Sequence, residues 1–343
     1  MSFRRIPVFL SILLAATVGG CVRAGYVFGD ADGATGGPTQ DSQPTDAYSA
    51  GSDAQRRDTV STDDGLAIDG LLPRKWCEVW RNPTAFSAPT PLAAVNTVET
   101  ESDPVWAGGK LYFTRKSEST GVADLFVASA TSLSAVGSAS SLVALNSSAD
   151  EGRIAFYPAS KVYAGGAVLA SRRSGSWQLY AVSGLPLRIV GGPILSTAAS
   201  GPSFSQGGTV LWFADVSGGD PGQALFFSTR TTPTATFGPR QLPNELSTPS
   251  REFNPWISAD ERVILFSSDR PGGQGDLDIW IATRGSANAP FDPPQPIGAV
   301  NSASTDDAPS LSEDNCTLLY SSQRNASAAG GEIFYATFLP GPS

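Results

Sequence analysis

Short apolar runs separated by turn-forming residues recur from about residue 100 to the C-terminus. The clearest run is Val263–Phe266, which follows Asp260-Glu261 and precedes the glycine-rich stretch Pro271–Gly275. Runs of this length, rich in β-branched and aromatic residues and bounded by Gly, Pro and Asp, are typical of β-strands joined by tight turns. The chain also has 36 Gly and 26 Pro, a content that favours many short strands over helices. We therefore predict an all-β domain.

The apolar runs belong to a repeated unit. Five prolines mark it at intervals of 54, 44, 53 and 54 residues: Pro104, Pro158, Pro202, Pro255 and Pro309. Sheets of this size bury both faces only by stacking on neighbours, so such repeats form rings or arrays. An arginine recurs where the apolar run ends, and we expect it to make an ion pair or a backbone contact within each unit: Arg115, Arg172, Arg270 and Arg324.

The best-preserved copy runs from Asn254 to Arg270 and continues with Asp278-Ile279-Trp280. Its pattern, Pro-x-x-Ser-x-Asp followed by an apolar strand, an Arg and an Asp-Ile-Trp, resembles the WD-like repeat of the TolB-type β-propeller family. The resemblance implies four-stranded antiparallel blades in a ring. It covers about 240 residues, most clearly 250–337. The α/β domain that precedes the propeller in TolB has no counterpart, so the resemblance implies a fold rather than a role.

Residues 86–97 indicate how the ring closes. They match residues 291–302 at an offset of 205, which is also the offset from Pro104 to Pro309. The second copy lies where the outermost strand of a blade belongs, whereas the first copy has no blade before it. We predict that 86–97 adds the outer strand to the C-terminal blade and removes the exposed sheet edges. This arrangement gives five blades, and six is the alternative if 71–103 contains further strands.

The first 70 residues predict export and anchoring. Arg4 and Arg5 precede the apolar stretch Ile6–Val18, which is too short to span a bilayer and is typical of a signal peptide. Val18-Gly19-Gly20-Cys21 resembles a bacterial lipobox, which implies lipidation of Cys21. We predict a signal peptide over 1–20, a disordered tether rich in Asp, Gly, Ser and Thr over 21–70, and a propeller over 71–343. The resemblance places the protein in the cell envelope, as an outer-membrane lipoprotein facing the periplasm or the surface.

Two further cysteines, Cys77 and Cys316, lie just before the closing segment and in the blade that it joins. Because an exported protein meets an oxidising compartment, we predict a Cys77–Cys316 disulfide. The alternative is two separate thiols.

The net charge of −9 disfavours nucleic acid as a partner, and the absence of His excludes Ser-His-Asp and Cys-His catalysis and His-ligated metal sites. We expect no cofactor and no metal site. Carboxylates cluster where the chain enters each innermost strand, a position that faces the channel of a propeller: Glu101, Asp103, Glu252, Asp306 and Asp307. They form our candidate ligand site, although Asp before Pro also favours a turn for backbone reasons alone.

These patterns favour an interaction module over an enzyme. We expect the propeller to bind an envelope protein, or a glycan, through its loops and channel. The alternative is a glycosidase-like enzyme that uses the channel carboxylates, because glycoside hydrolysis requires a pair of Asp or Glu side chains. A third alternative is an envelope protein with a purely structural role.

Overall fold

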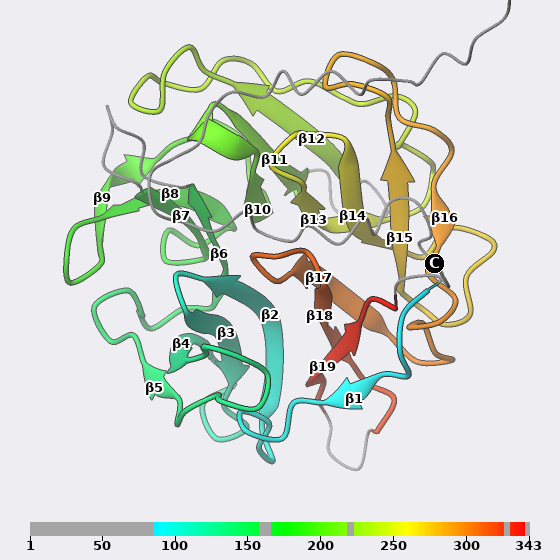
Figure 1. Cartoon of the computed structure of the whole chain (residues 1–343). Helices are drawn as coiled ribbons and strands as arrows, with labels where there is room; N and C mark the ends of the chain where they lie inside the picture. Colours follow the sequence, from blue (N-terminus) through cyan, green and yellow to red (C-terminus); the bar gives the residue numbers. More distant parts are fainter. Residues whose placement is uncertain (1–84, 158–165, 218–222, 326–329, 340–343) are drawn as a thin grey trace, which may run out of the picture. The chain divides into compact units, whose positions relative to one another are not determined.

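The computed structural model describes residues 85–157, 166–217, 223–325 and 330–339. Their strands form five antiparallel sheets around a common centre, the five-bladed propeller that the repeat predicts (Figure 1). The predicted signal peptide, Cys21, the predicted tether and Cys77 lie outside the described residues. Within those residues the sole helical segment is the 3₁₀ turn Gln206–Gly208, and no helix is long or apolar enough to cross a membrane.

Each blade begins with its innermost strand and continues outward. The first blade contains β2 (Thr100–Ala107), β3 (Lys110–Lys116), β4 (Ala123–Ser129) and β5 (Ser140–Ser141). The second contains β6 (Glu151–Tyr157), β7 (Gly166–Ser171), β8 (Gln178–Ser183) and β9 (Arg188–Pro193). The third contains β10 (Ala199–Phe204), β11 (Val210–Asp215) and β12 (Ala224–Thr229), with a single bridge from Phe227 to Gln241 where a fourth strand would lie.

The last two blades complete the ring. The fourth contains β13 (Glu252–Ile257), β14 (Val263–Ser268), β15 (Asp278–Thr283) and β16 (Gln295–Pro296). The fifth contains β17 (Asp306–Leu311), β18 (Thr317–Ser322) and β19 (Glu332–Thr337), and its outermost strand is β1 (Thr90–Pro91) from the other end of the domain.

The core lies between the blades, and β14 shows why its sequence is an unbroken apolar run. All six residues of this strand are buried. Leu265 packs with side chains of the fifth blade, such as Leu318, whereas its neighbour Phe266 packs with Trp212 of the third blade. Successive side chains of a strand point to opposite faces of its sheet. A strand whose sheet packs between two neighbouring blades therefore needs apolar residues at odd and even positions alike.

The closing segment pairs as predicted. Thr90 lies opposite Tyr335 and Pro91 opposite Phe334, and Phe86 forms an antiparallel bridge with Phe338. Asn96 then continues the ladder with its side chain: its Nδ2 donates to the carbonyl oxygen of Ile333 at 2.9 Å, and its Oδ1 accepts from the Ile333 amide at 2.9 Å. Figure 1 shows β1 beside β19. The prediction that 86–97 fastens the C-terminal blade is confirmed.

Asn146 provides a matched comparison, because it makes the same two bonds to the backbone of Leu125 within one blade, at 2.8 and 3.1 Å. We predict that Asn96→Ala lowers the free energy of unfolding by about 1–3 kcal/mol, because it leaves the Ile333 amide of β19 without its acceptor and removes one of the two donors to the Ile333 carbonyl. Hydrogen exchange should show faster exchange of β19 amides in this variant. Asn146→Ala should cost a similar amount and leave β19 exchange unchanged; equal exchange of β19 in both variants would contradict the closing role of Asn96.

Candidate functional site

Every innermost strand contains an irregularity at the same place. The register with the neighbouring strand shifts between Ser102 and Val105 in β2, and at the corresponding point of β6, β10, β13 and β17. In four of the five blades the residue at the shift has a positive φ and precedes the repeat proline: Asp103, Gly201, Asn254 and Ala308. A bulge leaves one residue outside the ladder, so proline's missing N–H costs no bond there. The repeat prolines therefore mark bulges.

The second blade departs from this pattern. Glu151 lies opposite Ser171 as Glu252 lies opposite Ser268. Ile154 follows Glu151 by three residues, as Pro255 follows Glu252, so Ile154 stands where the other blades have proline, and Arg153 precedes it. The sequence-based assignment of Pro158 to this position is wrong, and Pro158 itself lies outside the described residues. The second blade has no proline at the bulge, and Pro158, which lies near the expected spacing, was taken for it.

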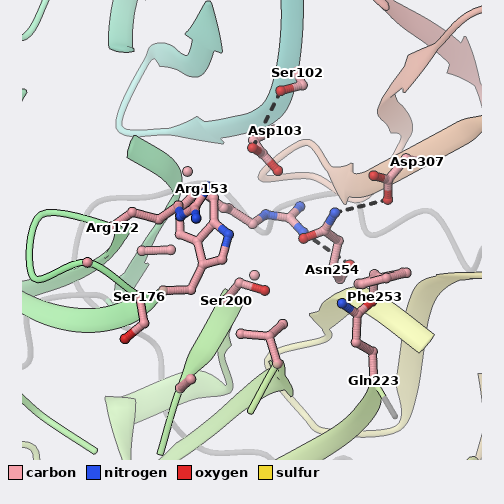
Figure 2. A pocket seen from close by; sticks show the side chains of 17 residues that line it. Ser102, Asp103, Arg153, Arg172, Ser176, Ser200, Gln223, Phe253, Asn254 and Asp307 are labelled. Carbon is pink, nitrogen blue, oxygen red and sulfur yellow. Dashed lines mark hydrogen bonds between the residues drawn. The ribbon is translucent and has the colours of Figure 1, made fainter. Parts of the chain in front are cut away.

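The bulges line a cavity of about 440 Å³ at the end of the ring where the innermost strands begin (Figure 2). Its wall includes residues from all five blades, and its polar side chains carry charges of both signs. Two aromatic side chains, Trp177 and Phe253, also line it. A volume in the range of about 300–1,000 Å³ with a few convergent polar groups and aromatic walls is typical of ligand sites.

Arg153 crosses the middle of the ring. Its side chain is only 2% exposed, and its guanidinium donates to the carbonyl oxygens of Asn254 at 3.2 Å, of Pro255 at 3.4 Å and of Pro309. Those carbonyls belong to the fourth and fifth blades, neither of which adjoins the second. Burial lowers the pKa of Arg153 to about 10, and the carboxylates of Asp103 and Asp307 oppose this shift. The group therefore stays cationic at neutral pH.

Asp103 and Asp307 face this guanidinium from the first and fifth blades (Figure 2). Asp307 accepts a hydrogen bond from Asn254 Nδ2 at 2.9 Å and another from the Ala308 amide at 2.6 Å. Asp103 accepts from the Thr114 hydroxyl at 3.3 Å and from the Ser102 hydroxyl at 3.5 Å, both weak bonds. Burial raises the pKa of Asp103 to about 6, with Asp307 adding to the rise and Arg153 opposing it.

The other three carboxylates of the predicted site lie elsewhere. Glu101, Glu252 and Asp306 are fully buried and form ion pairs with an arginine of their own blade: Glu101 with Arg115 at 2.8 Å, Glu252 with Arg270 at 3.1 Å and Asp306 with Arg324 at 2.7 Å. Each arginine also donates to a backbone carbonyl of the preceding loop, at Val95, Leu246 and Val300. The structure thus brings Asp103 and Asp307 to the cavity and places the other three within the blades.

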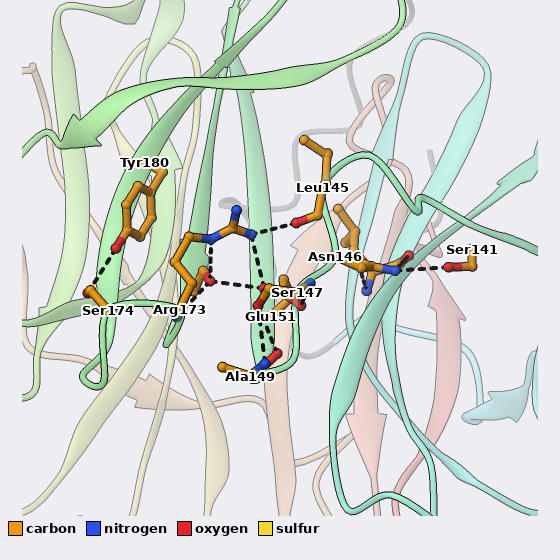
Figure 3. Close-up of polar contacts among 11 residues, drawn as sticks. Ser141, Leu145, Asn146, Ser147, Ala149, Glu151, Arg173, Ser174 and Tyr180 are labelled. Carbon is orange, nitrogen blue, oxygen red and sulfur yellow. Dashed lines mark hydrogen bonds and ion pairs between the residues drawn. The ribbon is translucent and has the colours of Figure 1, made fainter.

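The second blade repeats this network with Glu151, which the sequence did not single out. Arg173 donates to Glu151 Oε1 at 3.0 Å and to the carbonyl of Leu145 at 2.5 Å, and Ser147 donates to the same carboxylate at 2.6 Å (Figure 3). The prediction of an ion pair or a backbone contact within each blade is confirmed for Arg115, Arg270 and Arg324. Arg172 also fulfils it, because it pairs with Asp150 of its own blade at 3.4 Å, but it lines the cavity, and its neighbour Arg173 takes the place of the other three arginines.

Several cavity residues were missed from the sequence, chiefly Arg153, Trp177 and Asn254. The signal for Asn254 was present, since it precedes a repeat proline as Asp103 does. Trp177 lies in the hairpin between β7 and β8, and its ring packs so closely on Gly152 that a Cβ there would lie 3.1 Å from it. Cys316 lies in the turn before β18; because Cys77 is outside the described residues, the disulfide remains a prediction.

No protein-family model matches the chain, and no curated protein matches it either. Among solved structures, a GH62 α-L-arabinofuranosidase catalytic domain from Coprinopsis cinerea matches with a TM-score of 0.50 and 13% identity, covering 74% of this chain and 96% of that one. An endo-arabinase from Bacteroides thetaiotaomicron matches with a TM-score of 0.50 and 14% identity, covering 75% and 99%. A TolB structure from Agrobacterium tumefaciens matches with a TM-score of 0.40 and 16% identity, covering 68% and 76%. At these identities the likeness extends to the propeller fold.

We predict that Asp103→Asn stabilises the protein at pH 7.5, by on the order of 1–3 kcal/mol, and has no such effect at pH 4. The carboxyl titrates near 3.8 in the unfolded chain and near 6 in the fold. Ionisation is therefore unfavourable in the folded state, and stability falls as pH rises between these values. Asparagine also tolerates the positive φ of this position.

Urea unfolding of the variant at the two pH values tests this prediction. Asp292→Asn, at an exposed position outside the cavity, is the matched control and should change stability little at either pH. A stability gain of the same size at pH 4 and pH 7.5 would show that the Asp103 charge is not its cause.

Proposed function

We propose that this protein is an exported, lipid-anchored binding module of the cell envelope, which holds a protein partner through the cavity at one end of its propeller. The observation that carries the proposal is the convergence of bulge residues from the innermost strands on one cavity. Bulges re-aim side chains and recur beside functional sites, and here they turn charged and amide groups toward one space. The lipobox-like segment ending at Cys21 supports the envelope location.

A protein ligand fits the character of this cavity. Anchoring side chains at protein interfaces insert into pockets that combine aromatic walls with a few fixed polar groups, surrounded by a rim that excludes water. Trp177 and Phe253 provide the aromatic walls, while Asn254 and Asp307 hold each other in place. The ring holds these groups on strands of several blades, which limits the ordering that binding requires.

Site-specific photo-crosslinking of the full-length protein in its own membranes tests this proposal. We expect a crosslinker at Ser176, which is exposed and lines the cavity, to capture a protein partner. The same crosslinker at Ser183, at the other end of β8, should not capture it. Asp307→Asn should reduce the yield at Ser176 at least fivefold.

Equal capture from Ser176 and Ser183, or capture unaffected by Asp307→Asn, would place binding elsewhere on the surface.

If Cys21 carries the lipid anchor, the Cys21→Ser variant should be found in the soluble fraction instead of the membrane fraction.

A glycosidase-like enzyme remains the second candidate, because two carboxyl groups in different environments face one cavity. Asp103, with its pKa raised to about 6, has the character of a general acid, and Asp307 would serve as the base. The arabinofuranosidase and the endo-arabinase that share the fold are compatible with this alternative.

Hydrolysis of aryl glycosides by the purified protein decides between the two candidates. The enzyme alternative predicts turnover that Asp103→Asn or Asp307→Asn lowers about 10²–10⁴-fold, the usual contribution of a general acid or base. Turnover that survives both substitutions would come from a contaminant and would remove this candidate.

A further inference from the structure

The charged side chains on the inner wall of the cavity leave an excess of negative charge. Within the part of the chain that the structure describes, the guanidinium of Arg153 donates to backbone carbonyls of the fourth and fifth blades and to no carboxylate. Among the described residues, no ion pair within 4.0 Å joins Asp103 or Asp307 to a cation. Arg172, the other cation on the wall, is half-exposed and pairs with Asp150. The inner wall therefore carries two carboxylates against one guanidinium.

The two carboxylates also retain unused acceptor capacity. The bonds to Asp103 both reach Oδ2, and those to Asp307 both reach Oδ1, so each carboxylate has a second oxygen without a bonded donor among the described residues. Both residues are only partly buried, so these oxygens can accept from a ligand in the cavity that supplies N–H groups.

The aromatic walls define the rest of the ligand. Trp177 and Phe253 line the same cavity as the two carboxylates, so a ligand that reaches the acids passes apolar surface. Lysine combines a flexible apolar stem with a compact ammonium that carries three donors. Ammonium groups are also attracted to the faces of aromatic rings.

We propose that the cavity binds a primary ammonium group, presented as a lysine side chain of the protein partner, between Asp103 and Asp307. This inference rests on the proposed function, since it names the group through which that partner is held. The methylene stem lies along Trp177 and Phe253, and the positive charge offsets the excess negative charge of the inner wall.

Binding should depend on pH through Asp103. The charged groups that face this carboxyl are Arg153 from β6 and Asp307 from β17, and its hydrogen-bond donors are Ser102 and Thr114. Because the carboxyl titrates near pH 6 in the free protein, only a minority is ionised at pH 5. A ligand that requires the ionised form therefore binds about tenfold more weakly at pH 5 than at pH 7.5.

The test uses the full-length protein with two small probes, Nα-acetyl-lysine methylamide and Nα-acetyl-norleucine methylamide. The second probe keeps an unbranched apolar side chain and lacks the charge. Binding is followed by the indole N–H signal of Trp177, which is identified by its loss in Trp177→Phe. We expect a saturable shift with the lysine probe, at an affinity at least tenfold above that for norleucine, and about tenfold weaker binding at pH 5.

Three variants make the test specific. Asp307→Asn should weaken lysine binding at least tenfold and keep the pH dependence. Asp103→Asn should weaken it and abolish the pH dependence between pH 5 and 7.5. Asp292→Asn, the exposed control, should bind as the unmodified protein does.

Equal affinity for lysine and norleucine, or lysine binding that both cavity variants retain, would overturn the inference. A free diamine, 1,5-diaminopentane, that binds at least tenfold more tightly than the lysine probe would overturn the assignment to a protein side chain. The proposed function fails separately: lysine binding at the cavity with no partner captured from Ser176 would contradict a protein-binding role and leave the ammonium site standing. Conversely, a partner captured from Ser176 in a way that requires Asp307, together with equal affinity for the lysine and norleucine probes, would support the protein-binding role and contradict the ammonium site.

Discussion

One extra residue in each innermost strand determines which side chains this propeller presents at its centre. A regular strand would send alternate side chains to its two faces and into the packing between blades. The register shift interrupts this alternation at the same height in all five blades, and four of the shifted residues take a positive φ. The ring therefore presents a set of side chains to its own axis while the rest of each strand stays in the core.

The buried ion pairs hold the bulges at that height. In four blades an acidic side chain, placed just before the bulge, accepts bonds from an arginine of the same blade and from a Thr or Ser four residues earlier. Such pairs add little net stability, because desolvation of the charges offsets their attraction, but the loss of one partner leaves an uncompensated buried charge. Their effect is to fix how each connecting loop enters its innermost strand.

The sequence was sufficient to predict the ring and its closure. The match between residues 86–97 and 291–302 identified a strand without a blade, and the paired segment lies where that match requires. The candidate site was harder to predict. In a regular strand, Glu101 and Asp103 would face the same side, yet the bulge directs only Asp103 to the cavity. A linear pattern of acids does not distinguish these two environments, because the positive φ that separates them is a property of the folded ring.

The role of Arg153 at the cavity could not be predicted from the sequence for a related reason. Four blades place a proline after the bulge residue, and the blade without one looked like a weak copy of the repeat rather than a specialised one. The guanidinium finds its acceptors on two blades that lie more than 100 residues further along the chain. Only the closed ring brings those carbonyls within its reach.

The position of the Arg153 side chain bears on movement along the axis of the ring. Its guanidinium is bonded across the centre, so it lies in the path of any solute that would pass from one side of the ring to the other. A ligand that enters where the innermost strands begin passes the hairpin that carries Trp177 and meets this guanidinium before it can reach the other side.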